Sequence, residues 1–144
     1  MRPIINGLLL FMLLYIPFDI MVKSHTMGLS TVTVMQTLFG NADEFLDPMN
    51  KSVFLEFIHM EIFFLMMILL SLSAVYIRLL SHKSNTILTI NLLMGFALLT
   101  PVTLFCGYFY LAEFINLYVV SFFIWHFVAL YMIIRSLWEL NIAK

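Results

Sequence analysis

The stretch SVFLEFIHMEIFFLMMILLSLSAVYIRLL, residues 52–80, decides the fold of this chain. It is apolar over most of its length, and Arg78 stands close to its end. A helix of this length crosses the roughly 30 Å hydrocarbon layer of a bilayer with a turn or two to spare. We therefore expect a membrane-spanning helix around which the rest of the chain packs.

The composition of the whole chain agrees with that expectation. Of its 144 residues 63% are hydrophobic and 10% are charged, whereas soluble domains carry roughly 25% charged residues. The length favours a single domain. A single cysteine, Cys106, excludes an internal disulfide and a CxxC redox site. No phosphate loop, nucleophile–base pair or nucleic-acid footprint is present, so we expect neither an enzyme nor a nucleic-acid partner.

Hydropathy predicts four spans, at about residues 4–22, 53–80, 86–110 and 116–138. The predicted fold is an all-α, up-down bundle of four transmembrane helices with an outer loop at residues 23–51. Ser30 or Thr31 can cap a short helix in that loop. Its apolar residues follow a helical stripe, so the loop should be partly helical and lie on the membrane surface or the bundle. The stripe consists of Val32, Met35, Leu38 and Phe39.

Two prolines fall inside the predicted spans. Pro17 should bend the first span near its end, and Asp19 should mark the interface because a carboxylate deeper in lipid is costly. Pro101 frees the carbonyl of Ala97 one turn back, which Thr100 or Thr103 can satisfy.

The basic residues predict the orientation. With both termini in the cytoplasm, five basic residues are inside and two are outside, which satisfies the positive-inside rule. The inner five are Arg2, Arg78, Lys83, Arg135 and Lys144, and the outer two are Lys23 and Lys51. We expect an integral protein of the bacterial inner membrane, N-in and C-in, with an acidic outer face.

A metal site is one interpretation of the residues near the outer face. Glu56 and His59 are three apart and share a helical face. His25 could join them as a ligand, and Asp19 or Glu113 could add an oxygen, a set that suits a divalent metal. The alternative is a hydrogen-bonded network that holds the outer loop down.

The opposite side of the same helix carries a further acid. Glu61 lies about 160° around the helix from His59, at 100° per residue. The two side chains therefore should not meet the same neighbour. One is expected to face the bundle and the other the headgroups, the loop or a second subunit.

His126 is an isolated ionisable residue in the fourth span, which marks a candidate functional position. It could ligate haem together with His59, although the two differ by roughly 15 Å in depth. It could serve a proton relay or hydrogen-bond a quinone. The structural alternative is a neutral histidine bonded to Thr100 or Ser71.

The sequence is compatible with three functions, and the absence of a complete catalytic set favours the first of them. The first is a non-enzymatic accessory, anchoring or assembly subunit, in contact with lipid and with a membrane-protein partner or further copies of itself. The second is a redox or metal-handling subunit that binds haem, a quinone or a divalent metal. The third is a small channel or transporter. For the first function we expect no cofactor.

Overall fold

The computed structural model describes residues 2–142. Its regular elements are helices, and apart from an isolated bridge between Asn41 and Leu46 the described residues form no β-structure. The elements are α1 (Arg2–Thr26), α2 (Thr31–Phe39), the 3-10 turn η1 (Ala42–Glu44), α3 (Lys51–Leu80), α4 (Thr86–Phe109) and α5 (Phe114–Asn141). Helices α1, α3, α4 and α5 are long and apolar enough to span a membrane, which confirms the predicted number of such helices.

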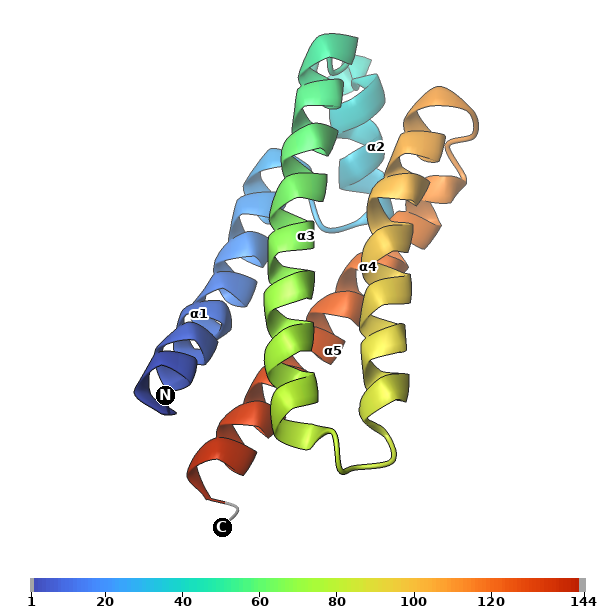
Figure 1. The fold of residues 1–144 in the computed structure, drawn as a ribbon. Helices are drawn as coiled ribbons and strands as arrows, with labels where there is room; N and C mark the ends of the chain where they lie inside the picture. Colours follow the sequence, from blue (N-terminus) through green and yellow to red (C-terminus); the bar gives the residue numbers. More distant parts are fainter. Residues whose placement is uncertain (1, 143–144) are drawn as a thin grey trace.

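The four long helices run alternately up and down (Figure 1). The start of α1 and the end of α5 lie at the same end of the bundle as the α3–α4 link. The opposite end carries α2, η1 and the α4–α5 turn (Figure 1). Helix α1 extends past residue 22 to Thr26 without a break at Pro17, so residues 23–26 belong to the helix and not to the loop.

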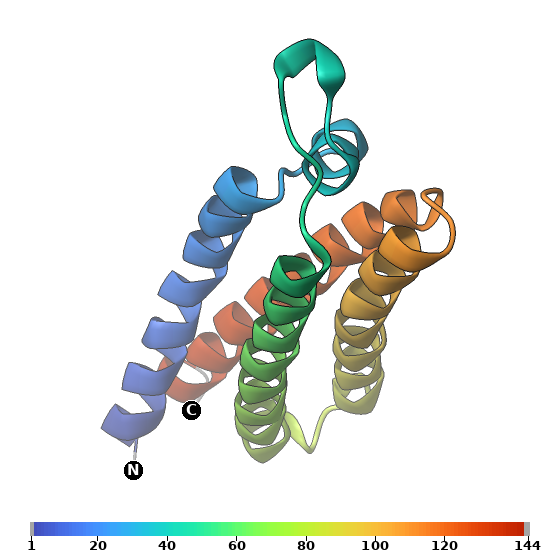
Figure 2. The same ribbon diagram turned by 90° about the horizontal axis from the view of Figure 1, so that it is seen from above.

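Helix α5 makes more extensive contacts with the other helices than any other element does. It contacts α1, α2, α3 and α4, whereas α1 and α3 meet only briefly. Both views show it crossing the other long helices obliquely (Figures 1 and 2). Small buried residues, Ser121, Ala129 and Ser136, let neighbouring helices approach its surface closely. The expectation that the chain packs around residues 52–80 is therefore wrong.

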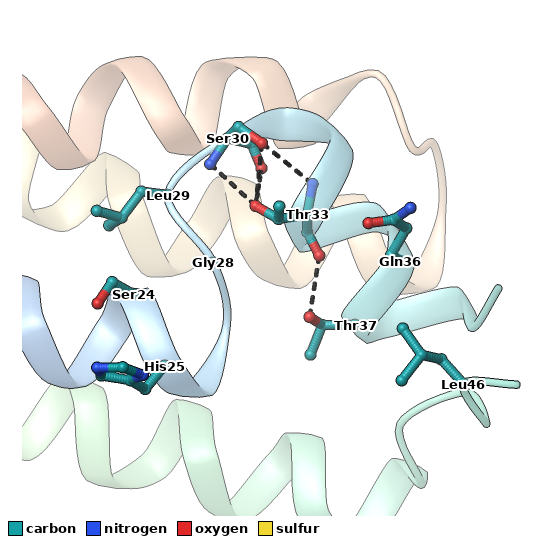
Figure 3. A pocket seen from close by; sticks show the side chains of 9 residues that line it. All are labelled: Ser24, His25, Gly28, Leu29, Ser30, Thr33, Gln36, Thr37 and Leu46. Atoms are coloured by element: carbon teal, nitrogen blue, oxygen red, sulfur yellow. Dashed lines mark hydrogen bonds between the residues drawn. The ribbon is translucent and has the colours of Figure 1, made fainter. Parts of the chain in front are cut away.

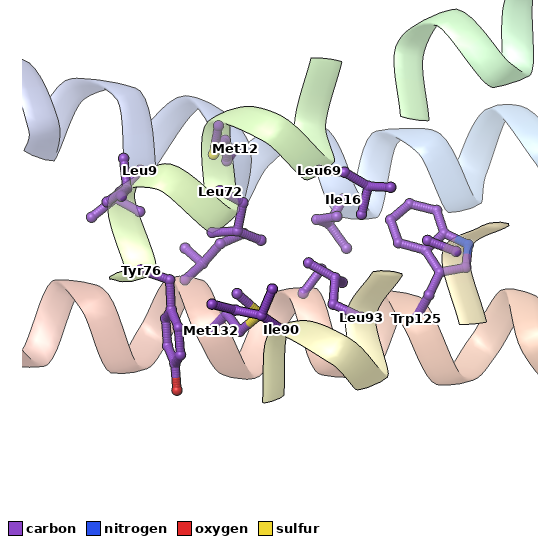
Figure 4. Packing of buried hydrophobic residues seen from close by; sticks show 14 of the residues in the cluster. Leu9, Met12, Ile16, Leu69, Leu72, Tyr76, Ile90, Leu93, Trp125 and Met132 are labelled. Carbon is purple, nitrogen blue, oxygen red and sulfur yellow. The ribbon is translucent and has the colours of Figure 1, made fainter. Parts of the chain in front are cut away.

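The apolar core is divided into two clusters. The larger one gathers side chains from all four long helices, including Leu9, Leu72, Leu93 and Met132 (Figure 4). The smaller one lies under the loop, where Val34 and Leu38 of α2 pack near Phe54 and Ile115. The polar site described below lies on the α1–α5 side of the bundle, between the two.

Helix α4 continues through Pro101. The hydroxyl of Thr100 donates to the carbonyl of Phe96 at 2.9 Å, and that of Thr103 donates to the carbonyls of Leu99 and Thr100 at 2.8 and 3.0 Å. Neither hydroxyl reaches Ala97, because each bonds the carbonyl on its own face of the helix. That part of the prediction is wrong.

Helix α2 begins at a capping box. Ser30 Oγ accepts from the backbone N–H of Thr33, and Thr33 Oγ1 accepts from the backbone N–H of Ser30. The face that packs on the bundle carries Val34 and Leu38, one turn apart. Val32, which the predicted stripe included, is 64% exposed. The stripe was therefore right for Leu38 and Met35, which pack in the smaller cluster, and wrong for Val32.

Candidate functional site

A contact between a histidine of α5 and a carboxyl group of α1 lies inside the bundle. Nε2 of His126 is 3.0 Å from Oδ2 of Asp19, and Nδ1 is 2.7 Å from the carbonyl oxygen of Phe122. The side chains of His126 and Asp19 are only 2% and 14% exposed. His126 lies roughly 18 Å along α5 from its first residue, close to the middle of the helix. The pair therefore joins two helices that are each long and apolar enough to span a membrane.

The partners of His126 differ from those expected. Thr100 bonds instead to Phe96 and, at 3.1 Å, to Ser121, while Ser71 lines a cavity between α1 and α3. The prediction that His126 bonds one of these hydroxyls is wrong. That Asp19 marks the interface stays a prediction, and the structure shows its carboxylate beside His126 with its side chain 14% exposed.

An ion pair between α1 and α3 lies one helical turn further along α1. The ammonium of Lys23 donates to Oε2 of Glu61 on α3, and the two side chains are 4% and 10% exposed. The same ammonium lies 4.3 Å from the ring centroid of Phe57, a cation–π contact. Glu61 thus faces the bundle while His59 is exposed, in agreement with their 160° separation. Four ionisable groups form one cluster: Asp19, Lys23, Glu61 and His126.

Two aromatic residues complete this cluster. The Tyr15 hydroxyl donates a long bond of 3.4 Å to Oδ1 of Asp19. The rings of Trp125 and His126 have their centroids 3.7 Å apart. Trp125 is 2% exposed, yet its indole Nε1 has no hydrogen-bond partner among the described residues. It lines a cavity of about 30 Å³ together with Tyr15, Asp19, Glu61, Phe64 and Leu65.

Two larger cavities extend from the cluster between α1 and α3. One, of about 290 Å³, includes Asp19, Lys23 and Glu61 in its wall. The other, of about 300 Å³, has an almost wholly apolar wall that includes Met12, Met67 and Ser71. Tyr15 and Phe64 line both of these and the small cavity. The three hollows therefore adjoin one another along α1 and α3, and together they are called the groove, with charged residues at one end and apolar residues at the other.

The proposed metal ligands lie away from this cluster. His25, Glu56 and His59 all have exposed side chains. The described part of the chain holds no group of three or more His, Cys, Asp or Glu side chains placed to bind a metal ion. Glu113 is exposed in the turn before α5. A metal site at these residues stays a prediction.

Haem ligation by His59 and His126 also stays a prediction. Both ring nitrogens of His126 already have hydrogen-bond partners within α5 and α1. An iron ligand would have to give up one of them.

An open hollow of about 550 Å³ lies between the end of α1 and α2 (Figure 3). His25 is the ionisable residue in its wall, while Ser30, Thr33 and Thr37 hydrogen-bond within the start of α2 (Figure 3). Gly28, at φ +87°, sits where a Cβ would collide with Thr33. These polar atoms fix the turn into α2 and do not converge on a ligand.

Sequence reasoning missed Tyr15, Lys23 and Trp125 as members of the site. Tyr15, Asp19 and Lys23 follow at intervals of four, so they share one face of a helix. A polar stripe of this kind in an otherwise apolar span was the available signal. Trp125 offered none, because a tryptophan in an apolar helix usually packs in the core.

Comparisons with known proteins add no relative. No family model, curated protein or solved structure matches the chain. The functional argument below therefore starts from the buried cluster and the groove.

Proposed function

We propose that the chain is a four-span protein of the bacterial cytoplasmic membrane with both termini in the cytoplasm. The end of the bundle where α1 begins and α5 ends carries Arg2, Arg78, Lys83 and Arg135. The positive-inside rule favours placing that end in the cytoplasm. Lys144, the fifth basic residue counted on this side, lies outside the described residues.

Cysteine labelling in intact cells tests this orientation. In a Cys106→Ser background, an impermeant maleimide should label Asp43→Cys in η1 and should not label Ser81→Cys in the α3–α4 link. Lysis should make Ser81→Cys reactive, which shows that the site itself is accessible. Labelling of Ser81→Cys alone in intact cells would contradict the proposal.

We infer that the cluster of Asp19, Lys23, Glu61 and His126 is the functional site of the protein and that it binds a proton. Ionisable side chains are rare inside membrane spans, and those present usually serve ion, proton or ligand binding. The single observation that carries the inference is the hydrogen bonding of His126. A carbonyl oxygen only accepts, so Nδ1, which faces Phe122, must carry a hydrogen.

The other ring nitrogen then faces a carboxylate oxygen of Asp19. A hydrogen bond between these two atoms needs one proton, on either the imidazole or the carboxyl group. In both arrangements the pair is neutral overall. Loss of the proton would place two lone pairs face to face, so the α1–α5 contact depends on it.

The net charge of the four-residue cluster depends on whether that proton is bound. Lys23 and Glu61 neutralise each other, so the four groups carry no net charge when the proton is held and one negative charge when it is lost. A net charge within a span is costly. Release of the proton should therefore accompany a movement of α1 or the arrival of another proton donor.

Infrared difference spectroscopy of the protein in liposomes, between acidic and alkaline buffer, tests proton binding. We expect a carboxyl or imidazole band that is lost in Asp19→Asn and in His126→Gln. The exposed residues supply matched controls, because Glu56→Gln and His59→Gln should retain the band. A difference spectrum that both cluster variants leave unchanged would contradict the proposal.

An accessory subunit is the second candidate, and the poor burial of α1 favours it. Only 17% of the most apolar stretch of α1 is buried in the bundle, against 44% for α5. The outward face of α1 is therefore free for lipid or for a partner helix. Cross-linking from Leu14→Cys in native membranes tests this, since Leu14 is 61% exposed, and only lipid adducts would contradict it.

A further inference from the structure

We propose that the groove between α1 and α3 binds a quinol, with its apolar chain in the lipid-facing part and its hydroxylated ring at the buried cluster. The inference rests on the proposed proton-binding function, since it names the molecule that would meet that proton. It draws on the shape of the groove, an unpaired indole donor, the local charges and the depth of the site.

The apolar part of the groove fits a hydrocarbon chain. Its walls come from α1 and α3, and Phe11, Phe63 and Met67 in these walls are more than half exposed. In a membrane that exposure is toward lipid, so a chain can enter sideways. The two larger cavities, of about 290 and 300 Å³, together fall in the usual range for small-molecule sites, roughly 300–1,000 Å³.

The charged part of the groove fits a hydroxyl group. The carboxylates of Asp19 and Glu61 can accept hydrogen bonds, and a quinol hydroxyl donates one. The indole N–H of Trp125 is buried in the same wall without a partner. A hydroxyl oxygen accepts from such a donor while its hydrogen bonds a carboxylate. One hydroxyl thus satisfies both kinds of group.

Charge and depth argue against a phospholipid head. Two carboxylates flank the site and the single ammonium, that of Lys23, is already paired with Glu61, so a phosphate would meet no free cation. The cluster also lies level with the middle of α5, deeper than the headgroup region. A neutral, hydroxylated ring can reach that depth, whereas a charged head cannot without a large cost.

The two tryptophans allow a direct binding test. Trp138→Phe leaves Trp125 as the reporter, and Trp125→Phe leaves Trp138 near the end of α5. Decylubiquinol titrated into detergent-solubilised protein should quench Trp125 fluorescence in a saturable manner. Quenching of Trp138 in the second variant should rise only linearly with concentration, as partition into the micelle does. Saturable quenching of both, or of neither, would overturn the proposal.

Two variants that add the same aromatic ring, one inside the groove and one outside it, form a matched pair. In the Trp138→Phe background, Ser71→Phe places a ring in the apolar cavity, whereas Ala74→Phe adds the same ring at an exposed position of α3. We expect Ser71→Phe to weaken decylubiquinol binding at least about tenfold and Ala74→Phe to leave it unchanged. Equal effects of the two variants would overturn the site.

Dioctanoylglycerol distinguishes a quinol from a hydroxylated lipid. Weaker binding than decylubiquinol supports the quinol, and equal or tighter binding overturns that assignment. The infrared band of Asp19 and His126 is recorded in liposomes on the same protein preparations. A retained band with no quinol binding would refute the quinol site alone, and a missing band with intact binding would refute proton binding alone.

Discussion

Two ion pairs join distant parts of this chain in very different surroundings. Lys23 and Glu61 connect α1 to α3 with side chains that are 4% and 10% exposed. Lys83 and Glu139 connect the α3–α4 link to α5 at 2.7 Å, with side chains that are 34% and 15% exposed. His82 lies 3.7 Å from the same Glu139 carboxylate but is 61% exposed. The chemistry of the two pairs is the same.

The difference lies in what replaces the partner when one side chain is removed. At the α3–α4 link, water and salt can solvate the remaining charge, so the pair adds little. In the groove, the remaining charge would stay between apolar helices at low dielectric. Burial, more than the distance between the atoms, should therefore decide how much each pair matters.

The largest effect should come from Glu61→Ala. It leaves the buried ammonium of Lys23 beside the ring of Phe57 and without the carboxylate to which it donates a hydrogen bond. We expect a loss of about 3–5 kcal/mol in the free energy of unfolding, the usual result of breaking a buried pair. Unfolding in mixed micelles with increasing SDS measures it.

Glu56→Ala is the matched control for that variant. Glu56 lies on the same helix with an exposed side chain, so its removal should change the free energy of unfolding by less than about 0.5 kcal/mol. Equal losses for Glu61→Ala and Glu56→Ala would show that burial does not determine how much each carboxylate contributes to the free energy of unfolding.

An intermediate effect is expected for the bond between Asp19 and His126. A double-mutant cycle of Asp19→Ala and His126→Ala should give a coupling of about 1.5–3 kcal/mol, as for hydrogen bonds to charged groups. A coupling near zero would mean that the two side chains do not interact in the folded protein.

The fold was largely predictable because hydropathy alone marks long apolar helices. Which helix is central was not, since the oblique path of α5 depends on small residues such as Ala129 meeting the right neighbours. Lys23 was assigned to the loop because a lysine usually ends a span. In the structure α1 continues to Thr26 and the lysine turns inward to Glu61.

The site was predictable only in part, for a related reason. Sequence spacing shows which residues share a helical face, but not what that face meets. Glu56 and His59 share a face that is exposed, while Asp19 and His126, 107 residues apart, face each other. His126 was singled out as the isolated ionisable residue in its span, but its partner depends on the crossing of α1 and α5.

The smallest effect should come from Lys83→Ala. The lysine is a third exposed, so water can solvate Glu139 once the lysine is removed, and reciprocal amide bonds between Asn6 and Asn141, both 3.0 Å, still hold α1 against α5 at this end of the bundle. We expect a loss several-fold smaller than for Glu61→Ala, and one that shrinks further at high salt because exposed pairs are screened. SDS unfolding at low and high ionic strength measures both. A loss as large as that of Glu61→Ala, and independent of salt, would mean that the Lys83 pair is as shielded from water as the buried one.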